Sequence, residues 1–232
     1  MALACLVIGV PGSHADEPPE DGFVGPAQME PLNIIIPLQI QHLVPRTAVA
    51  EVIIRLDESG KVVDSVCLHL PHHLLVEPIK RALGQIQFRP AMLDGEPVAV
   101  DLRAEIPVGE IGYYGILTIT PATYIEGRFA DISQYPNQLT LCPASELDRP
   151  LQILHRGAPV RYIDEEGNLV AGRVRVDFYV DSEGVPRMLR TPEEAPLALR
   201  DAAHHTVGNI RFVPPTCRHN PTVVKASIEV QF

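Results

Sequence analysis

The densest group of potential metal ligands in the sequence is formed by three histidines and one glutamate. His69, His72 and His73 are followed closely by Glu77. A metal site needs ligands that converge on one point and are oriented by further hydrogen bonds. The neighbouring side chains of His72 and His73 cannot both point inward from regular structure. We therefore predict that these histidines have a structural role and that the chain holds no metal.

Sequence patterns of the common enzyme classes are missing from the chain. There is no G-x-S-x-G, no glycine-rich phosphate loop, no H-E-x-x-H and no C-x-x-C. The acidic pair Glu193 and Glu194 has the composition of a solvated loop. We therefore predict that the protein is not an enzyme and that it uses no cofactor.

Composition and charge exclude further classes of protein. Of the 232 residues, 46% are hydrophobic and 21% are charged, which is typical of a folded chain. The formal net charge is −10, and Lys and Arg form no cluster, so we expect no nucleic-acid partner. The 23 prolines favour short strands and turns over long helices.

The amino-terminal segment resembles a secretory signal peptide. An apolar run from Met1 to Val10 leads to Ser13-His14-Ala15 just before Asp16. We predict a signal peptide over residues 1–15 and export of the protein. The alternative is a disordered cytosolic tail. The apolar run is about half of the ~20 residues that a membrane-spanning helix needs, so we predict no transmembrane span.

Cysteine usage leaves the disulfide pairing open. Cleavage before Asp16 removes Cys5 and leaves Cys67, Cys142 and Cys217. Three cysteines in an oxidising compartment allow at most one internal bridge and one free thiol.

The chain contains an internal repeat. When the sequence is shifted by 124 residues (212 − 88), Phe88 falls on Phe212 and the hydrophobic pattern stays in phase without a gap. Several identities recur in the two copies: Asp57 and Asp181, Gly60 and Gly184, Gly84 and Gly208, Ile86 and Ile210, Pro90 and Pro214, Pro97 and Pro221, Val100 and Val224, Glu105 and Glu229.

Each copy predicts the same order of elements. Alternating apolar residues predict a first strand, a Gly-containing turn and a second strand. Apolar residues at helical spacing then predict a helix that ends before a Phe-x-Pro segment, and a last alternating strand follows. The expected elements are strands at 50–56, 62–70 and 98–106 with a helix near 77–86, and strands at 174–180, 185–190 and 224–232 with a helix near 199–210.

From this pattern we predict an α+β fold built of two β-β-α-β modules. Each module is expected to have one helix on a small, mostly antiparallel sheet. The predicted domains are residues 31–108 and 150–232. The linker, residues 109–149, is too apolar for a free tether, so we expect it to be ordered and packed against the modules.

The order of these motifs resembles the carboxy-terminal domain of the TonB energy-transducer family. The motifs of the first copy are Asp57 to Gly60, Phe88 to Ala91 and Gly95 to Val98, and those of the second are Asp181 to Gly184, Phe212 to Pro215 and Asn220 to Thr222. The chain departs from the family in having no Trp and no anchor or Pro-rich spacer. The resemblance therefore implies a periplasmic protein-binding domain without coupling to an inner-membrane motor.

Two functions follow as expectations. In the first, the last strand of each copy is a sheet edge that binds a protein partner by strand addition. The partner is expected to be an outer-membrane receptor or another envelope protein. In the second, the repeats form a structural platform or a homodimer in the cell envelope. Free edges favour the first function, and edges paired with each other favour the second. The predicted partner-binding residues are Val98, Val100, Arg103, Glu105, Val224, Lys225, Ser227 and Glu229.

Overall fold

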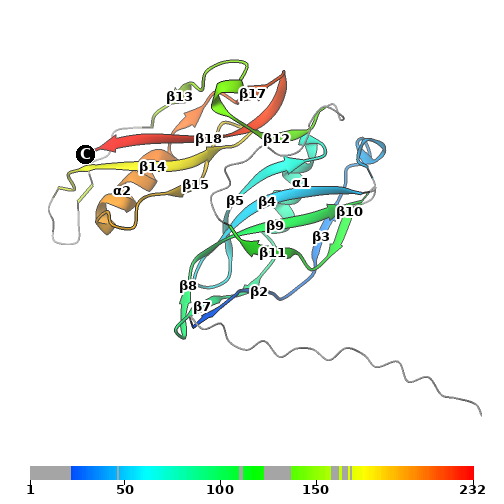
Figure 1. Cartoon of the computed structure of the whole chain (residues 1–232), viewed down its shortest axis with the longest axis horizontal. Helices are drawn as coiled ribbons and strands as arrows, with labels where there is room; N and C mark the ends of the chain where they lie inside the picture. Colours follow the sequence, from blue (N-terminus) through cyan, green and yellow to red (C-terminus); the bar gives the residue numbers. More distant parts are fainter. Residues whose placement is uncertain are drawn as a thin grey trace, which may run out of the picture.

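A computed structural model describes residues 22–45, 47–109, 112–122, 137–157, 162–163, 167 and 169–232. The predicted signal peptide, residues 1–15, lies outside the described residues. Figure 1 shows the strands of the first half and the strands of the second half as two adjoining blocks, with β12 between them.

The central feature of the described chain is a nine-stranded mixed sheet. Eight of its strands follow the order β11-β9-β4-β5-β12-β18-β14-β15, and β17 pairs with the start of β18. The pairings are antiparallel except that β12 runs parallel to β18. The strands are β4 (Ala48–Leu56), β5 (Val62–Leu70), β9 (Val100–Val108), β11 (Thr118–Pro121), β12 (Leu139–Cys142), β14 (Arg173–Val180), β15 (Pro186–Arg190), β17 (Thr216–Cys217) and β18 (Asn220–Gln231).

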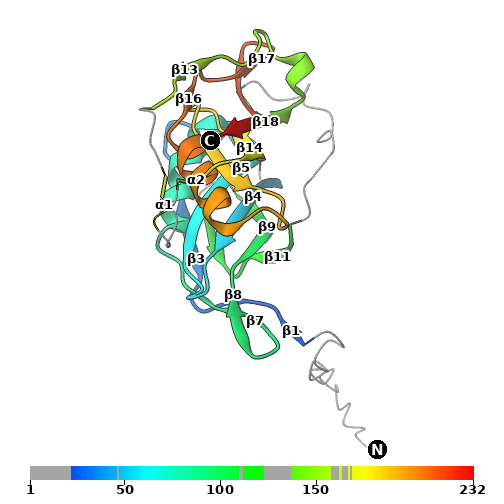
Figure 2. The ribbon, with the colours of Figure 1, turned by 90° about the vertical axis from the view of Figure 1, so that its left-hand side faces the viewer.

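Short strands and two α-helices surround this sheet. The short strands are β1 (Phe23–Val24), β2 (Ala27–Gln28), β3 (Leu32–Ile35), β6 (Phe88–Arg89), β7 (Ala91–Leu93), β8 (Glu96–Val98), β10 (Gly112–Gly115), β13 (Ile153–His155) and β16 (Arg211–Phe212). The α-helices are α1 (Val76–Leu83) and α2 (Leu197–Gly208), and 3-10 turns are η1 (Gln41–Leu43), η2 (His73–Leu75) and η4 (Ala144–Glu146). In the described part of the chain, no helix is long and apolar enough to cross a bilayer. Figure 2 shows the β7–β8 hairpin projecting at the end of the molecule opposite β17.

The predicted α+β class with two separate β-β-α-β modules is wrong. Strands make up 49% of the structure and helices only 16%, and strands of both halves belong to one sheet. The reason lies in β12, whose four residues are all buried. It pairs with β5 of the first half and with β18 of the second, so it joins what were predicted to be two sheets.

The core of the first half lies between the sheet and α1. The apolar face of the helix segment consists of Leu75, Ile79, Leu83 and Ile86, which are all buried. They pack in one cluster with inward-facing residues of β4, β5 and β9. Their helical spacing in the sequence places these side chains in one apolar stripe along the helix. The sheet covers this stripe, so the burial agrees with the predicted spacing.

A smaller core lies between α2 and the strands β14 and β18. The helix contributes Leu199, Ala203 and Val207, and Ile210 follows it. Phe178 of β14 packs against Phe212, and their ring centroids lie 5.7 Å apart.

A glycine turn approaches the Phe-x-Pro segment closely in both halves. Gly60 and Gly184 have φ values of +78° and +81°, in the left-handed region that glycine adopts without strain. The amide of Phe88 donates to Gly60 O (3.0 Å), and that of Phe212 donates to Gly184 O (2.8 Å). A Cβ on either glycine would lie 2.1 Å from the carbonyl oxygen of the facing phenylalanine. No larger residue fits this contact without a shift of the backbone.

Strand β15 of the second half docks against the first half through an irregular segment. The register with β14 shifts between Asp177 and Tyr179, and Met188 has a φ of +55° and is buried. The Met188 amide donates to Asp64 Oδ2 (2.6 Å). Arg55 Nη1 donates to the carbonyl oxygen of Leu189 (2.9 Å). The irregularity of β15 therefore places its backbone groups on polar partners from the other half.

Two aspartates, the partly buried Asp101 and the buried Asp181, form ion pairs across the same contact between the halves. Asp101 accepts hydrogen bonds from Arg55 Nε (2.7 Å) of its own half and from Arg190 Nη2 (2.5 Å) of the other. Asp181 lies 3.3 Å from Lys80 Nζ and 3.0 Å from Arg187 Nε.

These partners decide the ionisation of both aspartates. Burial opposes ionisation of Asp101, but the hydrogen bonds and charge of Arg55, with those of Arg190, hold its pKa below the ordinary value. Burial likewise opposes ionisation of Asp181. The Val185 amide, Lys80 and Arg187 outweigh that effect and lower its pKa.

The two phenylalanines generate the first prediction. Phe88→Ala and Phe212→Ala remove fully or almost fully buried rings, which typically costs about 3–5 kcal/mol each. We expect both variants to melt well below the parent in thermal denaturation followed by circular dichroism. Tyr114→Ala, at a ring that is 74% exposed, is the matched control and should melt near the parent. Unchanged melting of both Phe variants would contradict the equivalence of the two copies.

The aspartates generate the second prediction. A carboxyl whose pKa is lowered by folding stabilises the folded state above its unfolded pKa, about 3.9, and this contribution is lost as the pH falls through the folded pKa. Urea unfolding should therefore show a steep fall in stability below about pH 4. Asp101→Asn and Asp181→Asn should be less stable than the parent at pH 7 and should lose less stability on acidification. Equal acid sensitivity of parent and variants would refute this account.

Candidate functional site

Of the predicted binding residues of the first half, only Val98 lies on an edge strand among the described residues, at the end of the small β1-β7-β8 sheet. Val98 is in β8, where it pairs with Ala91 of β7. Val100, Arg103 and Glu105 are in β9, which pairs with β4 along its whole length. The other side of β9, from Leu102 to Glu105, pairs with β11. The prediction that β9 is an edge is therefore wrong, because the chain turns back after β10 and closes that edge with β11.

Side chains on β9 also have partners within the sheet. Arg103 forms an ion pair with Glu51, which is buried beside it on β4. Burial raises the pKa of Glu51, although the charge of Arg103 and its hydrogen bond act in the opposite direction.

The predicted residues of the second half lie on β18, whose two sides differ. One side pairs with β14 from Val224 to Gln231. The other side pairs with β12, but only at Thr222, Val223 and Val224. Among the described residues, no strand pairs with that side beyond Val224. The segment 226–231, which contains Ser227 and Glu229, therefore has a described strand on one side only; we call it the β18 edge. Lys225, which precedes this segment, has a partner of its own.

Backbone geometry shows which groups of the β18 edge point outward. Phe232 and Gly172, on the β14 side, exchange both backbone hydrogen bonds, at 2.9 and 3.3 Å. Successive residues of a strand direct their N–H and C=O groups to opposite sides. The register with β14 has no shift, so Ser227 and Glu229 direct these groups away from β14. These are the groups that an added strand would bond.

The side chains of the β18 edge alternate between two environments. Ala226, Ile228 and Val230 face the core under α2, yet they are only half-buried. Ser227 and Glu229 are exposed on the opposite face, and Glu229 forms an exposed ion pair with Arg173 (3.2 Å). A strand laid against this edge would complete the burial of the three apolar side chains.

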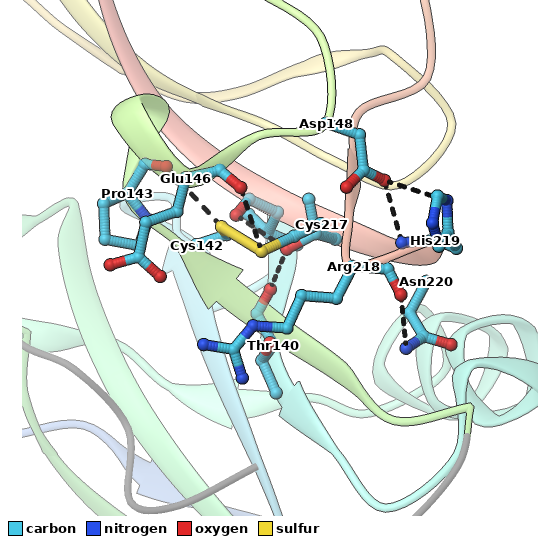
Figure 3. Close-up of a disulfide and its surroundings, with 11 residues drawn as sticks. Thr140, Cys142, Pro143, Glu146, Asp148, Cys217, Arg218, His219 and Asn220 are labelled. Atoms are coloured by element: carbon cyan, nitrogen blue, oxygen red, sulfur yellow. Dashed lines mark hydrogen bonds and ion pairs between the residues drawn. A yellow bond between two sulfur atoms is a disulfide. The ribbon is translucent and has the colours of Figure 1, made fainter. Parts of the chain in front are cut away.

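A disulfide anchors the start of β18. Figure 3 shows Cys142, at the end of β12, bonded to Cys217 of β17 next to the tight turn Arg218–His219. Both turn residues have positive φ, and the His219 amide donates to Asp148 Oδ2 (2.8 Å). Thr222 Oγ1 donates to Thr140 O (2.5 Å), which ties β18 to β12 in the same region. The bridge closes a loop of 75 residues, which in the chain-entropy model is worth about 4 kcal/mol.

The histidine cluster makes local structural contacts. The ring of His72 is buried, stacks on that of His73 at 4.8 Å, and accepts a hydrogen bond from the Leu74 amide through Nδ1 (3.2 Å). His73 Nδ1 lies 3.2 Å from the Asn137 carbonyl oxygen. Across the described ranges, no three His, Cys, Asp or Glu side chains gather as metal ligands.

Cys67 is the remaining thiol of the described chain. It is buried in the first core, and burial raises its pKa to about 12. A thiol in this environment stays protonated and unreactive.

Comparisons with known proteins return nothing similar: no family model, no curated protein and no solved structure matches this chain.

Proposed function

We propose that this chain is an exported protein-binding module that takes up an extended segment of an envelope protein on the β18 edge. The observation that carries the proposal is that β18 pairs with β14 from Val224 to Gln231, whereas no described strand pairs with its other side beyond Val224. Strand addition draws its affinity from main-chain hydrogen bonds and its specificity from alternate side chains. The proposal involves binding alone and assigns no reaction to the chain.

The order of motifs in the sequence also supports a protein-binding role, independently of the strand pairing. Strand, turn, strand, helix and a last strand in each copy resemble the TonB carboxy-terminal domain, for which the expected role is protein binding in the periplasm. Within the described residues, the last strand of the first copy, β9, has strands on both sides, whereas the last strand of the second copy, β18, is open on one side beyond Val224. We therefore place the proposed binding surface in the second half alone.

The disulfide supports export. Cys142 and Cys217 are bonded, and disulfides persist in oxidising compartments such as the bacterial periplasm. A buried free thiol at Cys67 is compatible with the same compartment because it is shielded from exchange.

A second candidate function is a structural one. Strand β12 pairs with both β5 and β18, so part of the edge of each half is closed within the chain. This observation favours a platform in the cell envelope. In that case the β18 edge would pair with the β18 edge of a second copy, as an antiparallel two-fold dimer.

Proline substitutions separate these functions. Ser227→Pro removes an N–H that points away from β14, a position where edge strands tolerate proline. We expect it to keep the fold and to lose capture of the partner from envelope fractions, whereas Ser227→Ala should retain capture. Ile228→Pro, the matched control, removes a bond to β14 and should lower the melting temperature. In the parent, hydrogen exchange at the Ser227 and Glu229 amides should slow when the partner binds.

The binding module and the structural platform predict different results in these experiments. Equal capture by folded Ser227→Pro and Ser227→Ala would exclude pairing at the β18 edge. A parent that is dimeric by light scattering, together with a monomeric Ser227→Pro and no captured partner, would support the platform instead.

Export has its own test. Amino-terminal sequencing of the protein expressed from its native locus should begin at Asp16, and thiol labelling under denaturing conditions should modify Cys67 alone before reduction. Recovery of an intact Met1 in the cytoplasm, with four reactive thiols, would contradict export.

A further inference from the structure

A groove of 610 Å³ lies where the two halves meet, away from the β18 edge. One wall comes from the first half and includes Leu102, Ile119 and Thr120. The other wall comes from β15 and α2 of the second half and includes Leu189 and Thr191. Its size falls within the range of small-molecule sites, and it combines apolar walls with a few polar groups, as such sites do.

Three arginines line this groove although the protein as a whole is acidic. They are Arg55, Arg190 and Arg200, and the carboxylates Asp101 and Glu193 lie in the same lining. Arg55 and Arg190 both form ion pairs with Asp101, so Arg200 is the arginine of interest for a ligand.

Arg200 is the cation of the groove that has no partner among the described residues. It is partly buried on the first turns of α2, and its Nε is shielded from solvent without a hydrogen-bond acceptor. A buried donor left without an acceptor costs about 1–3 kcal/mol, and more when it is charged. His204, one turn further on, adds an imidazole to the same wall and contacts Thr191 Oγ1 (3.3 Å).

The internal repeat shows that these cations are particular to the groove. Arg190 and Arg200 correspond, at the offset of 124, to Val66 and Val76 of the first copy. Both valines are buried in the first core. At these two positions the first copy has a buried valine and the second copy has an arginine. Both arginines line the groove. Packing of the module does not require them, since the first copy folds the same segments around valine.

We infer that this groove binds a small amphipathic carboxylate, whose charged group pairs with Arg200 and whose apolar part lies along Leu102, Ile119 and Leu189. A carboxylate accepts two parallel bonds from one guanidinium, which gives direction as well as affinity. An apolar chain or ring is the part that the walls of the first half would cover. The positive charge of Arg200 would repel a ligand that carries a cationic group in place of the carboxylate.

Decanoate is a suitable probe, measured by isothermal titration below its micellar concentration. The full chain should bind it saturably, and added NaCl should weaken the binding because the pair is electrostatic. The cation with the same chain, decyltrimethylammonium, should not bind. The isolated Nε–H signal of Arg200 in a nitrogen-correlated NMR spectrum should shift on addition of decanoate.

Arg200→Gln should weaken decanoate binding by about tenfold or more, and Arg200→Lys should retain part of the affinity. Arg175→Gln is the matched control, since Arg175 is an exposed arginine on β14 outside the groove. Loss of affinity in Arg175→Gln equal to that in Arg200→Gln would overturn the assignment. So would equal binding of the cationic probe, or no saturable binding of decanoate. Where Arg200→Gln fails to fold, the NaCl dependence and the NMR shift in the parent decide the question.

Discussion

The arrangement of the whole molecule depends on how the second half is fixed to the first. Strand β12 supplies one fixed point, because it bonds to β5 on one side and to β18 on the other. The contact between Asp64 and the Met188 amide supplies the second. With two fixed points the second half cannot rotate about a single linker. The groove between the halves and the open length of β18 both follow from this placement.

The second fixed point exists because the two copies have diverged. Asp64 and Met188 occupy equivalent positions in the repeat, 124 residues apart, yet they contact each other. Three other contact residues, Arg55, Lys80 and Asp101, are likewise replaced in the second copy by residues of different charge: Tyr179, His204 and Lys225. Identities within the repeat mark what each module needs in order to fold. Several mismatches of charge lie where the two halves meet, and they are a signal in the sequence by which this contact and the groove arginines could have been found.

The spacing of apolar residues in the sequence predicted which face of each helix and strand is buried. It did not predict which strands lie side by side. The helical stripe of Leu75, Ile79, Leu83 and Ile86 is buried as its spacing requires, and the glycine turns at Gly60 and Gly184 form in both copies. Alternation along β9 identifies its buried side chains equally well. It contains no information on which strand lies beside β9, because main-chain hydrogen bonding is independent of side-chain type. Strands β11 and β12 are each four residues long, too short for a periodic signal, and they decide both the fold class and which edge is open.

The difference in length between β12 and β18 explains why one edge is left partly open. Four residues of β12 cannot cover the twelve residues of β18, so no described strand lies beside the far end of β18 on that side. Exposed edges of this kind invite indiscriminate pairing, and charged side chains along the edge limit it. Glu229 is exposed on one face of this edge, whereas Ala226, Ile228 and Val230 are half-buried on the other. A strand that pairs here must therefore be apolar on the side of α2 and polar on the other. This requirement selects alternating segments and rejects uniformly apolar ones.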